Sequence, residues 1–180
     1  MFFKPKSVPL FKLERHVPKR LGQFSLEQIE VYPDRTSGTK YSYKSGQIVM
    51  TAFVYNQLEQ AIPDGWDNEL HMQEFESSFY GMVNLSPDLG WKDLICILEP
   101  ATLMHVNDNK LDSYLGAAIS FNDHRRTPLF EGFSFILLRG DAGHYNKLRC
   151  TFPKDIEDEA LEALADFGLL WSRALRATLN

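Results

Sequence analysis

The most concentrated charge between two apolar segments of this sequence lies in the stretch Asn122-Asp123-His124-Arg125-Arg126-Thr127-Pro128. The planar guanidinium group of arginine binds carboxylates and phosphates through two parallel hydrogen bonds. Arg125 and Arg126, next to His124, can therefore pair with an anionic group of a partner. The same composition is typical of a solvated hairpin loop, and this alternative stays open. We take His124, Arg125 and Arg126 as the candidate partner-binding residues.

The sequence contains none of the common motifs of nucleotide-binding or hydrolytic enzymes. It lacks G-x-x-x-x-G-K-[ST], G-x-G-x-x-G, H-E-x-x-H and G-x-S-x-G. A zinc site needs three or four converging ligands, and the histidines show no ligand spacing. We therefore expect no catalytic residue, no cofactor and no metal site. The histidines are His16, His71, His105, His124 and His144.

Two cysteines raise the question of a thiol nucleophile. Cys150 with His105 or His144 would supply the nucleophile and the base that such catalysis needs. Cys150 lies in the middle of an apolar segment, however, where a buried structural thiol is expected. Cys96 lies in a second apolar segment, so the sequence predicts two buried free thiols.

Two short polar motifs have a simpler explanation as turns. Asp108, Lys110 and Asp112 superficially resemble a calcium-binding loop, but the glycine in mid-loop and the terminal glutamate are missing. The tripeptide Arg139-Gly140-Asp141 spells an integrin-type motif, although Gly-Asp is ordinary turn chemistry. We interpret the first motif as a solvated hairpin turn and the second as a turn between two strands.

Length and composition are those of an ordinary globular protein. The 180 residues are 44% hydrophobic and 24% charged, which predicts one domain over residues 1–180. Residues 1–20, rich in proline and basic side chains, are expected to form an arm or an edge strand. The net charge of −5 argues against nucleic-acid binding, because no basic excess is available to displace the counterions of phosphates.

The spacing of apolar residues predicts strands first, then a helix, further strands and a last helix. Residues 48–55 are apolar on both sides of the chain, which indicates a strand covered on both faces. Apolar residues recur every three or four positions over Asp67–Leu85 and over Asp155–Leu179, as in amphipathic helices. Asp67 and Asp155 are the expected N-caps of these helices. The other strands are expected at Phe24–Tyr32, Tyr41–Lys44, Leu94–Leu98, Thr102–Val106, Tyr114–Phe121, Phe130–Leu138 and Tyr145–Phe152.

This order predicts an α+β fold. We expect one antiparallel sheet of about six to eight strands with two amphipathic helices packed on it, as in an αβα-like sandwich. The short apolar segment Leu94–Leu98 is expected in the centre of the sheet, because it has no polar side.

The order of elements resembles that of the PsbP-like and Mog-like α+β sandwiches, especially small uncharacterised bacterial proteins of that type. The residues that carry the resemblance are Gly38–Tyr55, Gly132–Pro153, and Phe167 and Trp171 on the last helix. Such relatives are mostly non-catalytic: photosystem II accessory proteins, a Ran-binding protein and bacterial envelope proteins. The resemblance implies a non-enzymatic domain that binds a protein partner or an assembly. The alternative is a small-ligand-binding protein or an enzyme with its site between the sheet and a helix.

The beginning of the chain gives an expectation about location. MFFKPKSVPLFK carries lysines and prolines where a signal peptide has a continuous apolar stretch, and no apolar run reaches the length of a spanning helix. We expect a soluble cytoplasmic protein if Met1 is native. If a signal peptide was removed, a periplasmic or envelope location is the alternative.

Overall fold

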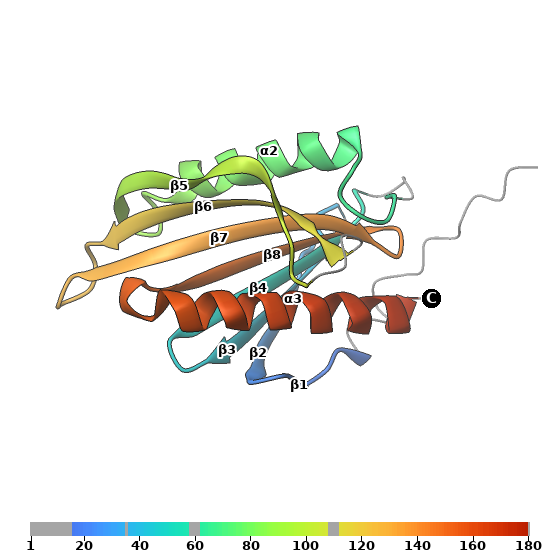
Figure 1. Cartoon of the computed structure of the whole chain (residues 1–180), viewed down its shortest axis with the longest axis horizontal. Helices are drawn as coiled ribbons and strands as arrows, with labels where there is room; N and C mark the ends of the chain where they lie inside the picture. Colours follow the sequence, from blue (N-terminus) through green and yellow to red (C-terminus); the bar gives the residue numbers. More distant parts are fainter. Residues whose placement is uncertain (1–15, 35, 58–61, 108–111, 180) are drawn as a thin grey trace, which may run out of the picture.

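The computed structural model describes residues 16–34, 36–57, 62–107 and 112–179. Within these ranges the chain forms an eight-stranded sheet and two long α-helices (Figure 1). No described helix has the length and apolar character needed to cross a membrane. The elements are β1 (Arg20–Leu21), β2 (Phe24–Val31), β3 (Thr39–Ser45), β4 (Ile48–Tyr55), α2 (Glu69–Leu85), β5 (Trp91–Met104), β6 (Tyr114–Asp123), β7 (Phe130–Asp141), β8 (His144–Pro153), the 3₁₀ turn η2 (Lys154–Ile156) and α3 (Glu157–Leu179).

The sheet consists of two four-stranded meanders that meet at its centre. The strand order is β1-β2-β3-β4-β8-β7-β6-β5, and all neighbouring strands are antiparallel. Helix α2 connects β4, at the centre, with β5, at the far edge. The predicted α+β class, the antiparallel sheet and the two helices are therefore confirmed. Of the arm expected over residues 1–20, the structure describes the end, where Arg20 and Leu21 form the short edge strand β1.

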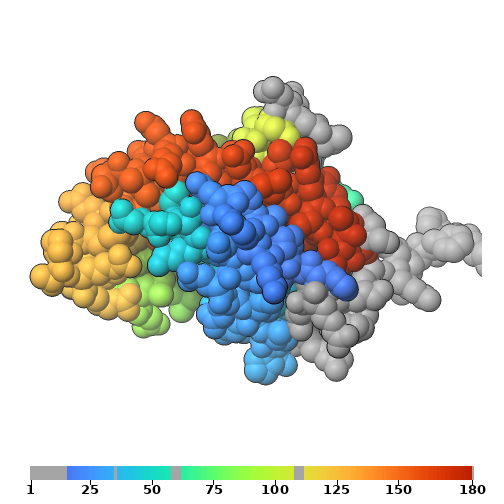
Figure 2. Space-filling model, turned by 90° about the horizontal axis from the view of Figure 1, so that it is seen from below, coloured from blue at the N-terminus to red at the C-terminus, as the bar shows by residue number. Residues whose placement is uncertain are grey.

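The two helices lie on opposite sides of the sheet, and each covers part of one face (Figure 1). Helix α3 packs on β7, β8 and β1, with Phe167 and Trp171 against Tyr43. On this face β1 and β2 lie directly beside α3 (Figure 2). Helix α2 packs on β5, β6 and β7, and no described residue of β2 or β3 belongs to its core cluster. The α2 face of β2, β3 and part of β4 is therefore left open.

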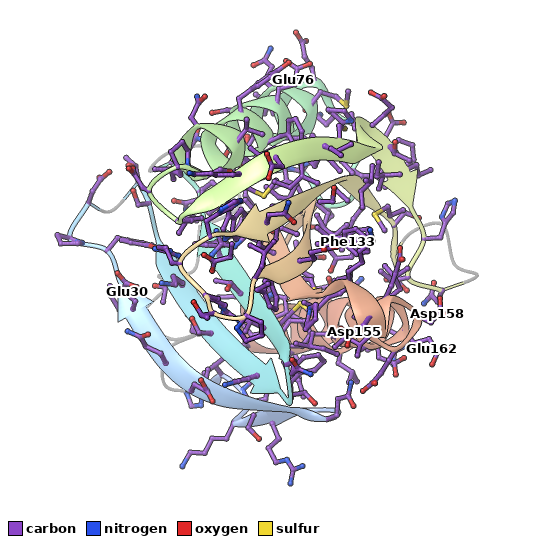
Figure 3. All side chains as sticks on the ribbon, turned by 90° about the vertical axis from the view of Figure 1, so that its left-hand side faces the viewer. Glu30, Glu76, Phe133, Asp155, Asp158 and Glu162 are labelled. Carbon is purple, nitrogen blue, oxygen red and sulfur yellow. The ribbon has the colours of Figure 1, made fainter. Side chains whose placement is uncertain are left out.

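The helices follow the predicted apolar stripes with local differences. Phe75, Phe79 and Met82 are buried as expected, but Met72 is exposed and His71 is buried instead. The N-cap of α2 is Asn68 rather than Asp67, and its side chain accepts a hydrogen bond from the backbone of Leu70 at 2.9 Å. Asp155 does not cap α3, because the chain first makes the 3₁₀ turn η2. Glu76 on α2 and Asp158 and Glu162 on α3 point away from the sheet (Figure 3).

The strand expected in the centre of the sheet lies at its edge. Leu94–Leu98 and Thr102–Val106 do not form two strands; most of both belongs to the single strand β5, which has only β6 as a neighbour. Ile95 is 62% exposed and Ile97 43% exposed. The pairing with β6 shifts register three times, and Asp93 and Ala101 have left-handed backbone angles. An apolar composition alone does not distinguish this irregular edge strand from a central one.

Arg139 and Asp141 are buried, and neither forms a solvated turn. Both belong to β7, with exposures of 2% and 0%, and their Nε and Oδ2 atoms are 3.2 Å apart. The turn itself is made by Ala142 and Gly143, whose φ angles of 51° and 79° suit a tight two-residue hairpin. The side chains of the Arg-Gly-Asp tripeptide are therefore not available to a partner in this structure.

Asp141 belongs to a buried polar network between the sheet and α3. Its Oδ2 accepts hydrogen bonds from Ser172 at 2.7 Å and from Asn146 at 2.8 Å. The side-chain oxygen of Asn146 accepts from the indole of Trp171 at 3.1 Å. Burial raises the pKa of the Asp141 carboxyl, while Arg139 opposes this effect. The network fixes α3 on the end of the sheet through partners in both layers.

Asp112, the last acidic residue of the expected calcium-like turn, belongs to a neighbouring ion pair. Its carboxylate lies 3.1 Å from Arg176 of α3 and accepts a hydrogen bond from Asn107 at 3.0 Å. Asp112 is only 8% exposed, so it is not part of a solvated turn. Asp108 and Lys110 lie outside the described residues.

The cysteines are both free, but only one of them is buried as expected. Cys150 lies in the core between the sheet and α3, and burial raises the pKa of its thiol. Cys96 is exposed because it lies on the irregular edge strand β5. The prediction of two buried thiols is therefore wrong for Cys96.

Replacing Asp141 with alanine should lower the free energy of unfolding by about 3–5 kcal/mol, because Arg139 would be left as an uncompensated buried charge. Asp141→Asn keeps the shape of the side chain and should lower the free energy of unfolding by a smaller amount. Asp166→Ala, on the exposed side of α3, is the matched control and should leave stability nearly unchanged. Urea unfolding measures the free energy of unfolding of all three variants. A loss of less than about 1 kcal/mol in Asp141→Ala would contradict the role of the network.

The native protein should react with one equivalent of a water-soluble disulfide reagent, at Cys96. Cys150 should react only as fast as the protein unfolds, because the buried thiol is neither accessible nor ionised. The Cys96→Ser variant should therefore show no fast phase. A fast phase that persists in this variant would show that Cys150 is accessible.

Candidate functional site

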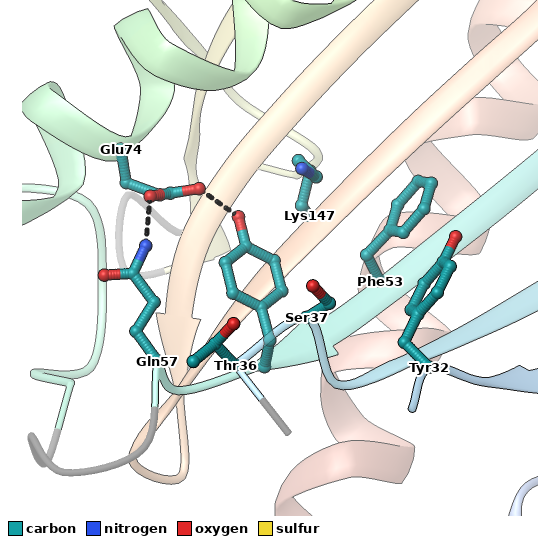
Figure 4. A pocket seen from close by; sticks show the side chains of 8 residues that line it. Tyr32, Thr36, Ser37, Phe53, Gln57, Glu74 and Lys147 are labelled. Carbon is teal, nitrogen blue, oxygen red and sulfur yellow. Dashed lines mark hydrogen bonds between the residues drawn. The ribbon is translucent and has the colours of Figure 1, made fainter. Parts of the chain in front are cut away.

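A pocket of about 520 Å³ lies on the open part of the sheet, next to α2 (Figure 4). It combines aromatic rings with side chains of both charges. Its lining residues are Tyr32, Thr36, Ser37, Phe53, Tyr55, Gln57, Glu74 and Lys147.

Strand pairing at the centre of the sheet places the floor of this pocket. In the pairing of β4 with β8, Phe53 lies opposite Lys147 and Tyr55 lies opposite Tyr145. Glu74 reaches the same place from α2, while Tyr32, Thr36 and Ser37 come from the connection between β2 and β3. Segments far apart in the sequence therefore meet in one pocket.

Lys147 carries a half-buried positive charge in the pocket. Its Nζ atom lies 5.0 Å from the ring centres of both Phe53 and Tyr55, and donates to the hydroxyl of Ser78 at 3.2 Å. Burial lowers the pKa of the Lys147 amine, although the negative charge of Glu74 opposes this effect. No carboxylate of the described residues lies within ion-pair distance of the ammonium group.

Glu74 already has partners within the protein. Its Oε1 accepts from the phenol of Tyr55 at 2.6 Å and from Ser78 at 3.1 Å, and its Oε2 accepts from Gln57 at 2.6 Å (Figure 4). Burial, with the nearby charge of Glu74, raises the pKa of Tyr55 well above its ordinary value. The Tyr55 phenol therefore stays a hydrogen-bond donor to Glu74, and the carboxylate is held in place.

The rim formed by Thr36 and Ser37 offers hydrogen-bond acceptors. Both hydroxyl groups donate to the carboxylate of Asp34, and the backbone N–H of Thr36 donates to it as well. The hydrogen bonds from Thr36 lower the pKa of Asp34 below its ordinary value. Because their protons are used in this way, the hydroxyl oxygens can accept from a ligand but are poorly placed to donate.

The predicted partner-binding residues lie elsewhere, in the loop between β6 and β7. Arg125 and Arg126 are 58% and 60% exposed and form ion pairs of 3.4 and 3.3 Å with Asp123. His124 lies 3.4 Å from Asp93, at the start of β5. The structure thus brings the three residues together beside the edge strand and places an acid next to each. None of them lines the pocket, and their binding of a partner stays a prediction.

The described structure does not bring Cys150 together with His105 or His144 as a nucleophile and its base. His105 Nδ1 lies 2.7 Å from the Ser113 hydroxyl, and His144 Nδ1 lies 2.9 Å from the carbonyl oxygen of Ala142. Cys150 lies within the apolar core on the α3 face. Among the described residues, no cluster of three or more His, Cys, Asp or Glu side chains could hold a metal ion.

Sequence reasoning missed the pocket, although one signal was present. In the segment Asn146–Cys150 the two cations, Lys147 and Arg149, alternate with residues that are not charged. In a central strand this pattern places both positive charges on one face of the sheet. The remaining lining residues carry no common motif and are brought together only by the fold.

No protein-family model matches the chain, and no curated protein shows significant sequence similarity to it. The resemblance to PsbP-like and Mog-like sandwiches therefore stays an expectation that rests on the order of elements.

Proposed function

We propose that this protein binds a small organic anion with a flat apolar group in the pocket next to α2. The proposal follows the alternative that the sequence left open, a ligand site between the sheet and a helix. The observation that carries it is Lys147, a half-buried cation without an ion-pair partner among the described residues.

The charge of Lys147 supports an anionic ligand. Removing an ammonium group from water is unfavourable unless an opposite charge and hydrogen bonds compensate it. Within the pocket, the Glu74 oxygens are bonded to Tyr55, Gln57 and Ser78. A carboxylate or similar group of a ligand would supply the missing partner and displace only water.

The aromatic side chains support a flat apolar group. Tyr32 and Phe53 both line the pocket, and Figure 4 draws both on the same side of Lys147. Such rings stack on planar groups, and small-molecule sites commonly measure about 300–1,000 Å³. The acceptors at Glu74, Thr36 and Ser37 suit an additional hydroxyl or amino group on the ligand.

Calorimetric titration with 2-naphthoate tests this function. Lys147→Met should weaken binding about tenfold or more, because a hydrogen bond to a charged group contributes about 1.5–3 kcal/mol. Lys154→Met, an exposed position in η2, should bind like the wild type. The uncharged 2-naphthamide should bind poorly to all variants. All variants should keep the wild-type melting temperature, so that lost binding does not reflect lost folding.

The pH dependence gives an independent readout. Because the pKa of Lys147 is lowered, its positive charge is lost at a lower pH than that of a free lysine. Binding should therefore weaken as pH rises toward 10, whereas Lys147→Arg should remain charged and keep its affinity. Equal binding of the amide and the carboxylate, or unchanged affinity in Lys147→Met, would contradict the proposal.

The exposed edge of β5 favours a second candidate function, the binding of a protein partner. Ile95 and Ile97 are exposed on an edge strand, where an extended segment of another protein can pair with the backbone. The loop with His124, Arg125 and Arg126 borders this edge through hydrogen bonds to Gly90 and Asp88. An extended segment with acidic residues beside this loop is the partner chemistry that fits.

The test uses a protein recovered by affinity capture and then purified. Ile95→Lys with Ile97→Lys, and separately Arg125→Ala with Arg126→Ala, should each weaken its binding about tenfold, and added salt should weaken wild-type binding. Val31→Lys, at an exposed apolar position on β2 near the opposite edge of the sheet, is the control and should bind normally. Equal affinity of all four proteins would contradict this surface.

A further inference from the structure

A second cation lies beside Lys147 on the same face of β8. Arg149 follows it by two residues, and alternate residues of a strand point to the same side. Their Cα atoms are therefore about 7 Å apart. In the pairing with β4, Lys147 lies opposite Phe53 and Arg149 lies opposite Thr51. The two positive side chains rise from neighbouring positions at the centre of the sheet.

Arg149 lacks a negative partner in the described structure. It is only partly exposed, burial lowers the pKa of its guanidinium group, and its electrostatic neighbour is the phenol of Tyr32, which lines the pocket. Its charge also acts on Lys147, where it disfavours the ammonium form. Two like charges are thus held close together and partly removed from water: Lys147 lines the pocket, and Arg149 lies beside it, near the lining residue Tyr32.

The acidic side chains around these cations already have partners. Glu30 pairs with Lys40 at 2.8 Å, and Glu74 is bonded to Tyr55 and Gln57. Neither Lys147 nor Arg149 takes part in any ion pair formed by the described residues. The two cations together are therefore compensated best by a ligand with two negative charges.

We infer that the ligand is a phosphate monoester of an aromatic or heterocyclic alcohol, with its phosphate between Lys147 and Arg149. This inference rests on the proposed function and specifies the ligand class. A phosphate monoester carries close to two negative charges at neutral pH and offers three acceptor oxygens. The guanidinium fork of Arg149 can bind two of these oxygens, and the ammonium group of Lys147 can bind the third.

The remainder of the pocket suits the other half of such a ligand. The ring would lie against Phe53 and Tyr32, which line the pocket together with Lys147. A hydroxyl or amino group on the ring would face the acceptors at Thr36 and Ser37, whose protons are held by Asp34. Lys147, as a donor to the phosphate, and Thr36 and Ser37, as acceptors for ring substituents, line the same pocket, and Arg149 lies near its lining residue Tyr32.

Calorimetry with 2-naphthyl phosphate, 2-naphthoate and inorganic phosphate tests the inference. The wild type should bind the ester about tenfold or more tightly than 2-naphthoate, and inorganic phosphate more weakly than either. Arg149→Met should remove this preference with little effect on 2-naphthoate, whereas Lys147→Met should weaken both naphthyl ligands. Arg173→Met, an exposed position on α3, is the matched control. Arg149→Lys should give an intermediate preference, because it keeps the charge and loses the fork.

The pH dependence of binding separates the effect of the ligand's charge from the effect of its shape. The second proton of a phosphate monoester leaves near pH 6, so the preference for the ester should grow between about pH 5 and pH 8. Equal binding of the ester and 2-naphthoate, unchanged in Arg149→Met, would overturn the inference and leave the proposed function in place. Inorganic phosphate binding as tightly as the ester would overturn the aromatic part of the ligand class. If neither naphthyl ligand binds, the proposed function fails together with the inference.

Discussion

The pairing of β4 with β8 is the interaction on which the rest of the structure depends. It joins two four-stranded meanders into one sheet, with seven residue pairs between Val49–Tyr55 and Tyr145–Thr151. Because side chains alternate between the faces, the same pairing builds two different environments. Met50 and Cys150 meet in the core under α3, while Phe53 and Lys147 meet on the floor of the pocket.

Strand β8 shows how a structural polar group differs from a candidate binding group. Asn146 points toward α3, where Trp171 and Asp141 satisfy its amide within the buried network. Lys147, the next residue, points to the other face, and its one hydrogen-bond partner among the described residues is the Ser78 hydroxyl. Buried polar groups in folded proteins are nearly always paired. An incompletely compensated cation in a pocket is therefore stronger evidence for a ligand than any number of satisfied polar groups in the core.

Local periodicity predicted the elements of this fold well, because each element needs an apolar stripe of its own. Phe167 and Trp171 are buried on α3 as their spacing indicates, and the two-sided strand β4 does lie at the centre of the sheet. Local periodicity does not predict strand order, because the order depends on which segments distant in the sequence pair with each other. The exposure of Ile95 on β5, and the burial of Arg139 and Asp141, follow from that order. The pocket was missed for the same reason, because Tyr32, Glu74 and Lys147 meet only once β4 and β8 have paired.

The separation of β4 from β8 along the chain also governs how this protein can fold. The strands from β1 to β4 are synthesised first, but the edge of β4 has no partner until β8 follows, and its apolar side has no cover until α3 follows. Contacts between distant segments form slowly because the intervening loop must first be closed. During synthesis the N-terminal meander therefore presents an unpaired edge and an uncovered apolar face for most of the elongation time. A chain that stops before β8 keeps both features permanently and is a natural target for chaperones and for aggregation.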